Sequence, residues 1–272
     1  MKHAVLPLLT LGLFAMVVAD RLSHAVASAS PETAVQGPSD TRPATVELDQ
    51  SDPPESSVSR AAPERPPLSS STPTIERLAR LAVRQQLSRE AGMTYLDSLI
   101  VSTDSVVRRW PDRSGTPLRV AIIEGGPAGY QPRMAEYVRE ALGRWENAGI
   151  GVRFMTVSDT TEAEILVHWI DHFDFDRAGQ TDLTWDQAGR VRRAAILLAL
   201  RTNTGVVLPG PALLTVAVHE AGHALGLPHS PDSNDVMFPA TQTARLSERD
   251  RRTVQVLYQL PTGPVRDLGA MP

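Results

Sequence analysis

Apolar and polar positions follow helical and strand periods only from residue 75 onward. Apolar residues between Ile75 and Leu87 recur on one helical face, which predicts a helix that ends near Gly92. The segment Met134–Asn147 has the apolar stripe of an amphipathic helix packed on a sheet. A third helix is predicted over Pro211–Leu225, because proline at the first helical position removes no hydrogen bond.

Shorter apolar segments between these helices are typical of β-strands. Four of them span residues 118–123, 152–157, 163–170 and 194–200. The last is a continuous apolar run, as expected for a strand that is covered on both faces. A fifth segment, Gly179–Trp185, alternates weakly and is predicted to be an exposed edge strand. The order of these elements predicts an α/β fold with a mostly parallel sheet and helices packed against it.

The first 74 residues lack the pattern of a folded domain. A short polar start, an uncharged apolar stretch from Ala4 to Ala19 and small residues after it predict an export signal over residues 1–29. The apolar stretch is shorter than the ~20 residues of a membrane-spanning helix, which favours a cleaved signal over its alternative, an uncleaved signal anchor. Residues 30–74 are rich in proline and serine and predict a disordered linker.

The rest of the chain divides into three predicted parts. Residues 75–109 form a helical N-terminal segment, and whether it is a pro-segment is left open. Residues 110–261 form the main domain, and residues 262–272 form a C-terminal tail. We expect an exported protein, secreted or in the cell envelope, with an N-terminal membrane anchor as the alternative location.

Charge and cysteine content narrow the candidate chemistry. The net charge of -4 over 272 residues gives no reason to expect nucleic acid as a partner. A membrane is expected as a partner only if the N-terminal signal is uncleaved, and we expect a monomer. The chain has no cysteine, which excludes disulfides, thiolate metal ligands and a cysteine nucleophile. Any metal must therefore be bound by histidines and carboxylates.

The predicted helix 211–225 carries two histidines at the spacing of metal ligands. His219 and His223 are four residues apart, so their rings project from one helical face about one turn apart. Glu220 follows His219 about 100° around the helix, where its carboxylate can address a metal-bound water instead of the metal. The pattern H-E-x-x-H alone is common, so it needs support from neighbouring residues.

That support follows directly after the helix. Gly226 allows a left-handed departure from the helix end, and Pro228 prevents the helix from resuming. The turn can therefore return His229 to the metal as a third ligand. Three protein ligands leave one position open for water, which distinguishes a catalytic zinc from a structural one. The sequence predicts one zinc ion bound by His219, His223 and His229.

The longer pattern H-E-x-x-H-x-x-G-x-x-H, with Met237 in the segment DVMFP, resembles the metzincin metalloproteases. Ser230 after the third histidine makes the chain similar to the matrixin branch, and the resemblance covers roughly residues 110–261. It implies a twisted five-stranded sheet with an antiparallel edge strand, an active-site helix and a C-terminal helix over residues 246–260. It also implies that Gly226, Met237 and Pro239 support the site, with Met237 as an apolar floor below the imidazoles.

The same resemblance implies where substrate lies and which family features are missing. An edge strand in this architecture pairs with extended substrate, which makes its residues candidates for substrate binding: Gly179, Gln180, Thr181, Asp182 and Leu183. The stretch 168–186 lacks the family's pattern for a structural zinc or calcium, so neither ion is predicted. His168 and His172 are interpreted as a strand and a loop histidine, with an accessory metal site as the alternative.

We therefore expect a zinc-dependent endopeptidase that hydrolyses extended polypeptides, with Glu220 as general base on the attacking water. A narrow-specificity processing peptidase tethered by an uncleaved anchor is one alternative. The alternative from another class is a non-catalytic zinc-binding interaction module of the cell envelope. Glu220 argues against that module, because a non-catalytic site needs no unbound carboxylate beside its ligands.

Overall fold

The computed structural model describes residues 75–97, 105–113 and 115–265. The predicted export signal, the linker and the last residues of the predicted tail lie outside this part of the chain. Among the described residues, no helix is both long and apolar enough to cross a membrane.

The elements follow the predicted order along the chain. The helices are α1 (Ile75–Arg89), α3 (Arg133–Glu146), α4 (Gly210–Ala224) and α5 (Glu248–Gln259). The main strands are β2 (Leu118–Ile122), β3 (Phe154–Thr156), β4 (Ile165–Ile170), β5 (Gly179–Trp185) and β6 (Val191–Ala199). Two short strands, β1 (Val106–Val107) and β7 (Gly263–Pro264), form a separate antiparallel pair. The helix that begins at Ile75 ends at Arg89, three residues before the predicted end at Gly92.

The main sheet has five strands in the order β3-β2-β4-β6-β5. All neighbours are parallel except β5, which pairs antiparallel with β6 at one edge of the sheet. This confirms the predicted mostly parallel sheet with an antiparallel edge strand. The strand β5 spans the same residues, Gly179–Trp185, that the sequence indicated.

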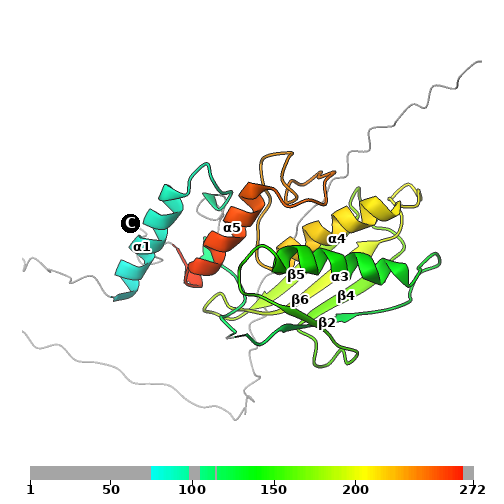
Figure 1. Cartoon of the computed structure of the whole chain (residues 1–272), viewed down its shortest axis with the longest axis horizontal. Coiled ribbons are helices and arrows are strands. Elements are labelled where there is room, and N and C mark those ends of the chain that lie inside the picture. Colours follow the sequence, from blue (N-terminus) through cyan, green and yellow to red (C-terminus); the bar gives the residue numbers. More distant parts are fainter. Residues whose placement is uncertain (1–74, 98–104, 114, 266–272) are drawn as a thin grey trace, which may run out of the picture. The chain divides into compact units, whose positions relative to one another are not determined.

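Helices α3 and α4 pack together on one face of this sheet (Figure 1). Along β6, Ala194, Ile196 and Leu198 are buried toward these helices. On the other face Ala195 and Leu197 are only half-buried, and Ala199 at the end of the strand is fully buried. The prediction that this strand is covered on both faces was therefore wrong in part. The apolar run reflects the half-buried outer face of a central strand, which tolerates apolar residues without a helix above it.

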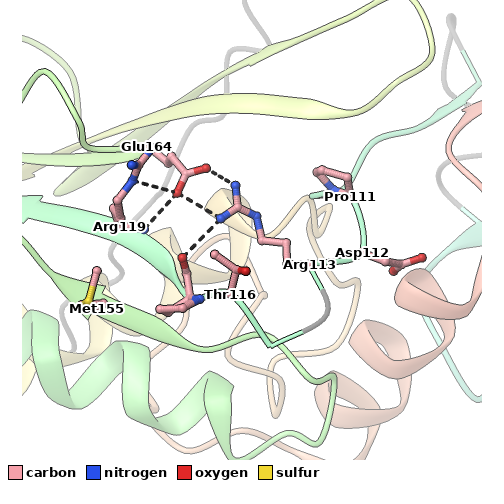
Figure 2. Close-up of a pocket in the computed structure, with 8 residues that line it drawn as sticks. Pro111, Asp112, Arg113, Thr116, Arg119, Met155 and Glu164 are labelled. Carbon is pink, nitrogen blue, oxygen red and sulfur yellow. Dashed lines mark hydrogen bonds and ion pairs between the residues drawn. The ribbon is translucent and has the colours of Figure 1, made fainter.

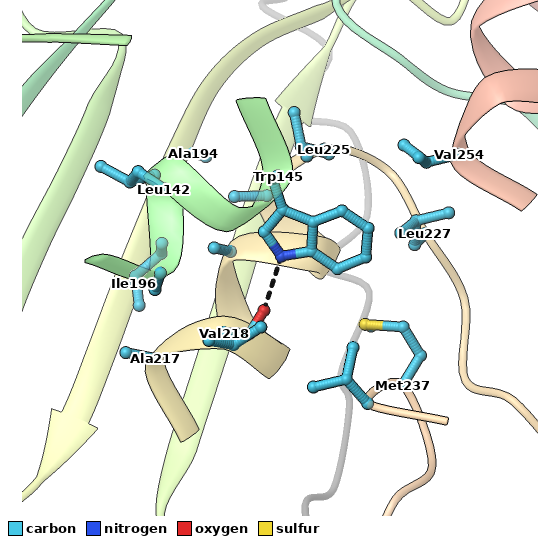
Figure 3. Close-up of a cluster of buried hydrophobic side chains, with 14 of the residues drawn as sticks. Leu142, Trp145, Ala194, Ile196, Ala217, Val218, Leu225, Leu227, Met237 and Val254 are labelled. Atoms are coloured by element: carbon cyan, nitrogen blue, oxygen red, sulfur yellow. Dashed lines mark hydrogen bonds between the residues drawn. The ribbon is translucent and has the colours of Figure 1, made fainter. Parts of the chain in front are cut away.

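The helix α4 is fixed by polar bonds as well as by apolar packing. The indole N–H of Trp145 in α3 donates to the Val218 carbonyl at 2.8 Å, and Met237 lies beside the six-membered ring of the indole (Figure 3). At the C-terminus of α4, the indole N–H of Trp110 donates to the Ala224 carbonyl at 2.8 Å. Because the last four carbonyls of a helix have no partner within it, this side chain helps to define where α4 ends.

A glycine in α4 lets the helix approach Trp145 and Met237 closely. A Cβ atom built on Gly222 would overlap the Met237 sulfur and lie 2.8 Å from the Trp145 ring. By contrast, a Cβ on Gly143 of α3 would meet no atom within 4 Å.

These two glycines predict opposite effects of the same substitution. Gly222→Ala overpacks the core and is expected to destabilise the domain by about 1–3 kcal/mol. Gly143→Ala is the matched control, and it is expected to stabilise the domain by up to about 1 kcal/mol because alanine favours the helix. Urea unfolding of both variants measures the difference. Equal midpoints for the two variants would contradict the packing described here.

Candidate metal centre

Helix α4 and the turn after it bring three histidines together. His219 and His223 project from the last two turns of α4, and His229 follows the turn at Gly226. Gly226 has φ +97°, and a Cβ there would overlap the Arg108 carbonyl. Only glycine adopts this backbone next to another main-chain segment without strain. The predicted reason for Gly226, a left-handed departure from the helix, therefore holds, and the close approach of Arg108 adds to it.

The Nε2 atoms of the three histidines converge. The Nε2 of His223 lies 3.0 Å from that of His219 and 3.2 Å from that of His229. His219 is fully buried and His223 nearly so, while His229 is partly exposed. Across the described ranges, these residues form the one group of three or more histidine or acidic side chains close enough to bind a metal ion.

The other ring nitrogens determine what the convergence means. The Nδ1 of His219 lies 2.7 Å from the Val236 carbonyl, and the Nδ1 of His223 lies 2.8 Å from the Leu227 carbonyl. A carbonyl oxygen only accepts, so both Nδ1 atoms must carry the proton. In a neutral imidazole the Nε2 atom then carries a lone pair. Lone pairs directed at one point repel one another unless a cation lies between them, so the donor set fits a metal ion.

Burial keeps these rings neutral. It lowers the pKa of His223 to about 4, although the bond to Leu227 opposes the change. The pKa of His219 is also well below its usual value, because of burial and then of the charge on His223. Neutral imidazoles are the form that binds zinc, and three of them leave a coordination position open. Zinc therefore fits this group better than calcium or magnesium, which prefer oxygen ligands.

Glu220 lies beside the ligands and faces the edge strand β5. It is fully buried, and its Oε2 accepts a hydrogen bond from the Thr181 hydroxyl at 2.6 Å. A Cβ on Gly179 would overlap the Glu220 carboxylate. Two of the predicted substrate-binding residues thus contact the predicted catalytic carboxylate through their α4-facing side. The sequence offered one signal of this contact: glycine and threonine alternate on the buried side of β5.

The turn that holds the Val236 carbonyl depends on two buried aspartates that sequence reasoning missed. Asp235 accepts from the Ser247 hydroxyl at 2.7 Å and from the Arg249 guanidinium at 2.7 Å. Asp250 accepts from the Val236 N–H at 2.8 Å and also takes part in the capping box of α5. The available signal was the sequence Ser-Glu-Arg-Asp at residues 247–250, which is a capping-box pattern.

Comparisons with known proteins agree with this geometry. The family model described as Matrixin matches residues 110–259. The chain belongs to the matrixin family. It is 43% identical to matrix metalloproteinase-15 (Homo sapiens) over 76 residues, which are 26% of this chain and 11% of that protein. It is 49% identical to macrophage metalloelastase (Oryctolagus cuniculus) over 57 residues, which are 19% of this chain and 12% of that protein.

A third relative is matrilysin (Felis catus), 44% identical over 54 residues, which are 18% of this chain and 21% of that protein. The chain thus matches only about a tenth to a fifth of the length of these curated relatives. The matrixin match confirms the family that the sequence pattern suggested. Together with their convergence, it identifies His219, His223 and His229 as the zinc-binding group. The N-terminal segment before residue 110 lies outside the matched region.

The matrixin domain also has an open pocket that does not take part in this centre (Figure 2). Arg113 and Arg119 line it, and both interact with the Glu164 carboxylate, so the charges that line it are largely paired. None of the three histidines lines this pocket. His172 lies elsewhere, in an exposed pair with Asp171 at 2.8 Å, as a loop histidine would.

The depressed histidine pKa values predict acid sensitivity of the metal-free matrixin domain. The unfolded chain protonates these rings near pH 6.5, whereas folded His223 does so near pH 4. Their contribution to stability is therefore fully present above about pH 6.5 and is lost as pH falls toward 4. Each ring adds a slope of up to about 1.4 kcal/mol per pH unit in that window.

Urea unfolding of protein from which a chelator has removed the metal, between pH 7.5 and 4, measures how the free energy of unfolding changes with pH. His223→Asn should flatten the slope, and Thr184→Val, which changes an exposed residue without an ionisable group, should leave it unchanged. A slope that is the same in wild type and in His223→Asn would contradict the assignment of a buried neutral ring.

Proposed function

We propose that this matrixin is a zinc-dependent endopeptidase in which Glu220 is the general base. The observation that carries the proposal is the position of Glu220, a buried carboxylate next to the histidine group and not itself one of its members. Bound zinc would supply a Lewis acid and lower the pKa of a coordinated water to about 7. A carboxylate that is not a ligand is free to accept the proton of the attacking water.

The remaining roles are assigned from the chain's own contacts. The Thr181 hydroxyl donates to Glu220 Oε2 and thereby fixes the orientation of the carboxylate. Glu220 would pass the accepted proton to the leaving amine, which completes hydrolysis of the peptide bond. Met237, fully buried against Gly222, keeps α4 at a fixed distance from the turn that follows. This rigid support suits a site that must hold reacting groups in place.

The edge strand β5 supports binding of an extended polypeptide. The Ala199 N–H donates to the Ala178 carbonyl, so the main-chain groups of Ala178 point toward β6. In an antiparallel pair every second residue points the same way, so the N–H and C=O groups of Gln180 and Asp182 also face β6. By the same alternation, the main-chain groups of Gly179, Thr181 and Leu183 point toward the open edge. A substrate strand could add there by main-chain hydrogen bonds, directly above the Glu220 carboxylate.

Export to the cell envelope or outside the cell remains part of this proposal, on the ground of the N-terminal sequence alone. The competing proposal, a zinc-binding module without catalysis, leaves the buried Glu220 without a purpose. A buried carboxylate costs free energy, and a module that only binds zinc would gain nothing from it.

A matched pair of proteins tests the catalytic role. Glu220→Ala is expected to retain stoichiometric zinc and to lose peptide cleavage by about 10²- to 10⁴-fold, because it removes the general base only. Glu136→Gln, a change of an exposed carboxylate on α3, serves as the control and should keep most activity. Zinc is measured by metal analysis and cleavage with a peptide library. Zinc-replete wild type without activity would support the binding module instead.

The bond between Thr181 and Glu220 gives a second prediction for the same site. Thr181→Val removes the hydroxyl and keeps the shape, so kcat should fall by about 10-fold while KM changes little. Thr181→Ser should restore most of the loss. Thr184→Val is the control, because Thr184 is an exposed residue of the same strand. A kcat loss of equal size in the Thr184 variant would assign the effect to the strand and not to the hydroxyl.

A further inference from the structure

The N-terminal segment before the matrixin match is bound to the C-terminal helix. Leu87 of α1 and Leu96 after it are fully buried. The Arg252 guanidinium of α5 binds the Glu90 carboxylate through two contacts, at 2.5 and 2.9 Å. Leu87 and Leu96 belong to the same apolar core as Val254 and Leu257 of α5, and the ion pair joins residues 75–97 to this helix.

Tyr95 is the polar centre of this contact. Its side chain is 3% exposed, and its hydroxyl donates to Asp250 Oδ1 at 3.0 Å. Its main-chain N–H also donates to the Thr253 hydroxyl of α5 at 3.4 Å. Asp250 is fully buried, and burial raises the pKa of its carboxyl group. Each donor to this carboxylate offsets part of the free energy that its burial costs.

Asp250 connects Tyr95 to a histidine of the zinc-binding group. Its Oδ2 accepts the Val236 N–H at 2.8 Å, and the Val236 carbonyl accepts the Nδ1–H of His219 at 2.7 Å. The chain of bonds thus runs from Tyr95 through Asp250 and Val236 to His219. Both main-chain groups of Val236 are therefore hydrogen-bonded, which holds its carbonyl in one orientation toward His219. Groups that orient a ligand in this manner raise metal affinity and are themselves sensitive to loss of their partners.

We propose that residues 75–97 are a built-in part of the zinc centre, in which Tyr95 is a positioning residue for His219. In this role the segment supports metal binding and does not inhibit the enzyme. Residues 75–97 lie before the matrixin match and act on the zinc-binding group. Their role rests on the proposed function only where peptide cleavage is measured.

The test uses the full chain with two point variants of the same contact. Tyr95→Phe removes the hydroxyl that donates to Asp250 and keeps the ring. Glu90→Gln breaks the ion pair with Arg252 at the margin and leaves Asp250 untouched. Zinc affinity is measured by competition with a chelator, and exchange of the Val236 amide and the His219 Nδ1 proton is followed by NMR. The values of kcat and KM are measured with zinc in excess.

We expect Tyr95→Phe to bind zinc about 10-fold more weakly, at the low end of effects for groups that support a ligand. The Val236 amide and the His219 Nδ1 proton should exchange faster, and kcat should fall while KM stays within about twofold. Glu90→Gln should leave zinc affinity and kcat within about twofold of wild type. If Tyr95→Phe does not fold, Thr253→Val removes the acceptor of the Tyr95 main-chain N–H, keeps Asp250 and is expected to weaken zinc binding in the same direction.

Two results would overturn the proposal. If folded Tyr95→Phe has the same zinc affinity and the same exchange rates as wild type, the chain of bonds does not position His219. Higher activity in either variant would identify residues 75–97 as an inhibitory segment. The zinc measurements keep this proposal separate from the proposed function. If wild type binds zinc but cleaves no peptide, the endopeptidase proposal fails, and the effect of Tyr95→Phe on zinc affinity still decides this one.

Discussion

The zinc-binding geometry depends on two hydrogen bonds from histidine to main-chain carbonyls. The Nδ1 protons of His219 and His223 are directed to Val236 and Leu227, which leaves lone pairs on Nε2 that converge. Because these acceptors belong to loops and not to regular elements, the loops must be fixed from outside. The buried carboxylates of Asp235 and Asp250 fix the loop around Val236, and the fold around α5 serves this purpose.

Most of the fold could be predicted because its signals are local. The periods of 3.6 and 2 residues located α3, α4 and five strands to within a few residues, and β5 without error. The burial of the outer face of β6 was predicted only in part, because an apolar run in a central strand does not reveal which faces the helices cover. Which faces are covered depends on α3 and α4 packing on the same side of the sheet. This packing involves contacts between distant parts of the chain, so a local pattern of apolar residues does not predict it.

The same distinction applies to the site. The ligands are local, since His219, His223 and His229 lie within one helix and its turn, and their spacing alone predicted the group. The contacts that orient the site join distant positions: Thr181 with Glu220, and Tyr95 with Asp250. The sequence around a single tyrosine or threonine does not indicate which distant residue its hydroxyl bonds. Only the capping-box pattern at Ser247 and Asp250 is visible in the sequence, and such a pattern indicates a helix start and not a second bond to Val236.

Three glycines show how little space the site leaves around these contacts. Gly179 meets the Glu220 carboxylate, Gly222 meets Met237, and Gly226 meets the Arg108 carbonyl. Each lies where a strand, a helix or a turn approaches α4 or its end more closely than a side chain allows. The metzincin pattern requires only Gly226, so the other two reflect the way this chain packs. A site held by such close contacts has few alternative arrangements, because packed interiors do not deform gradually. The converging imidazoles are therefore set by the packing of the whole domain and not by the ligand spacing alone.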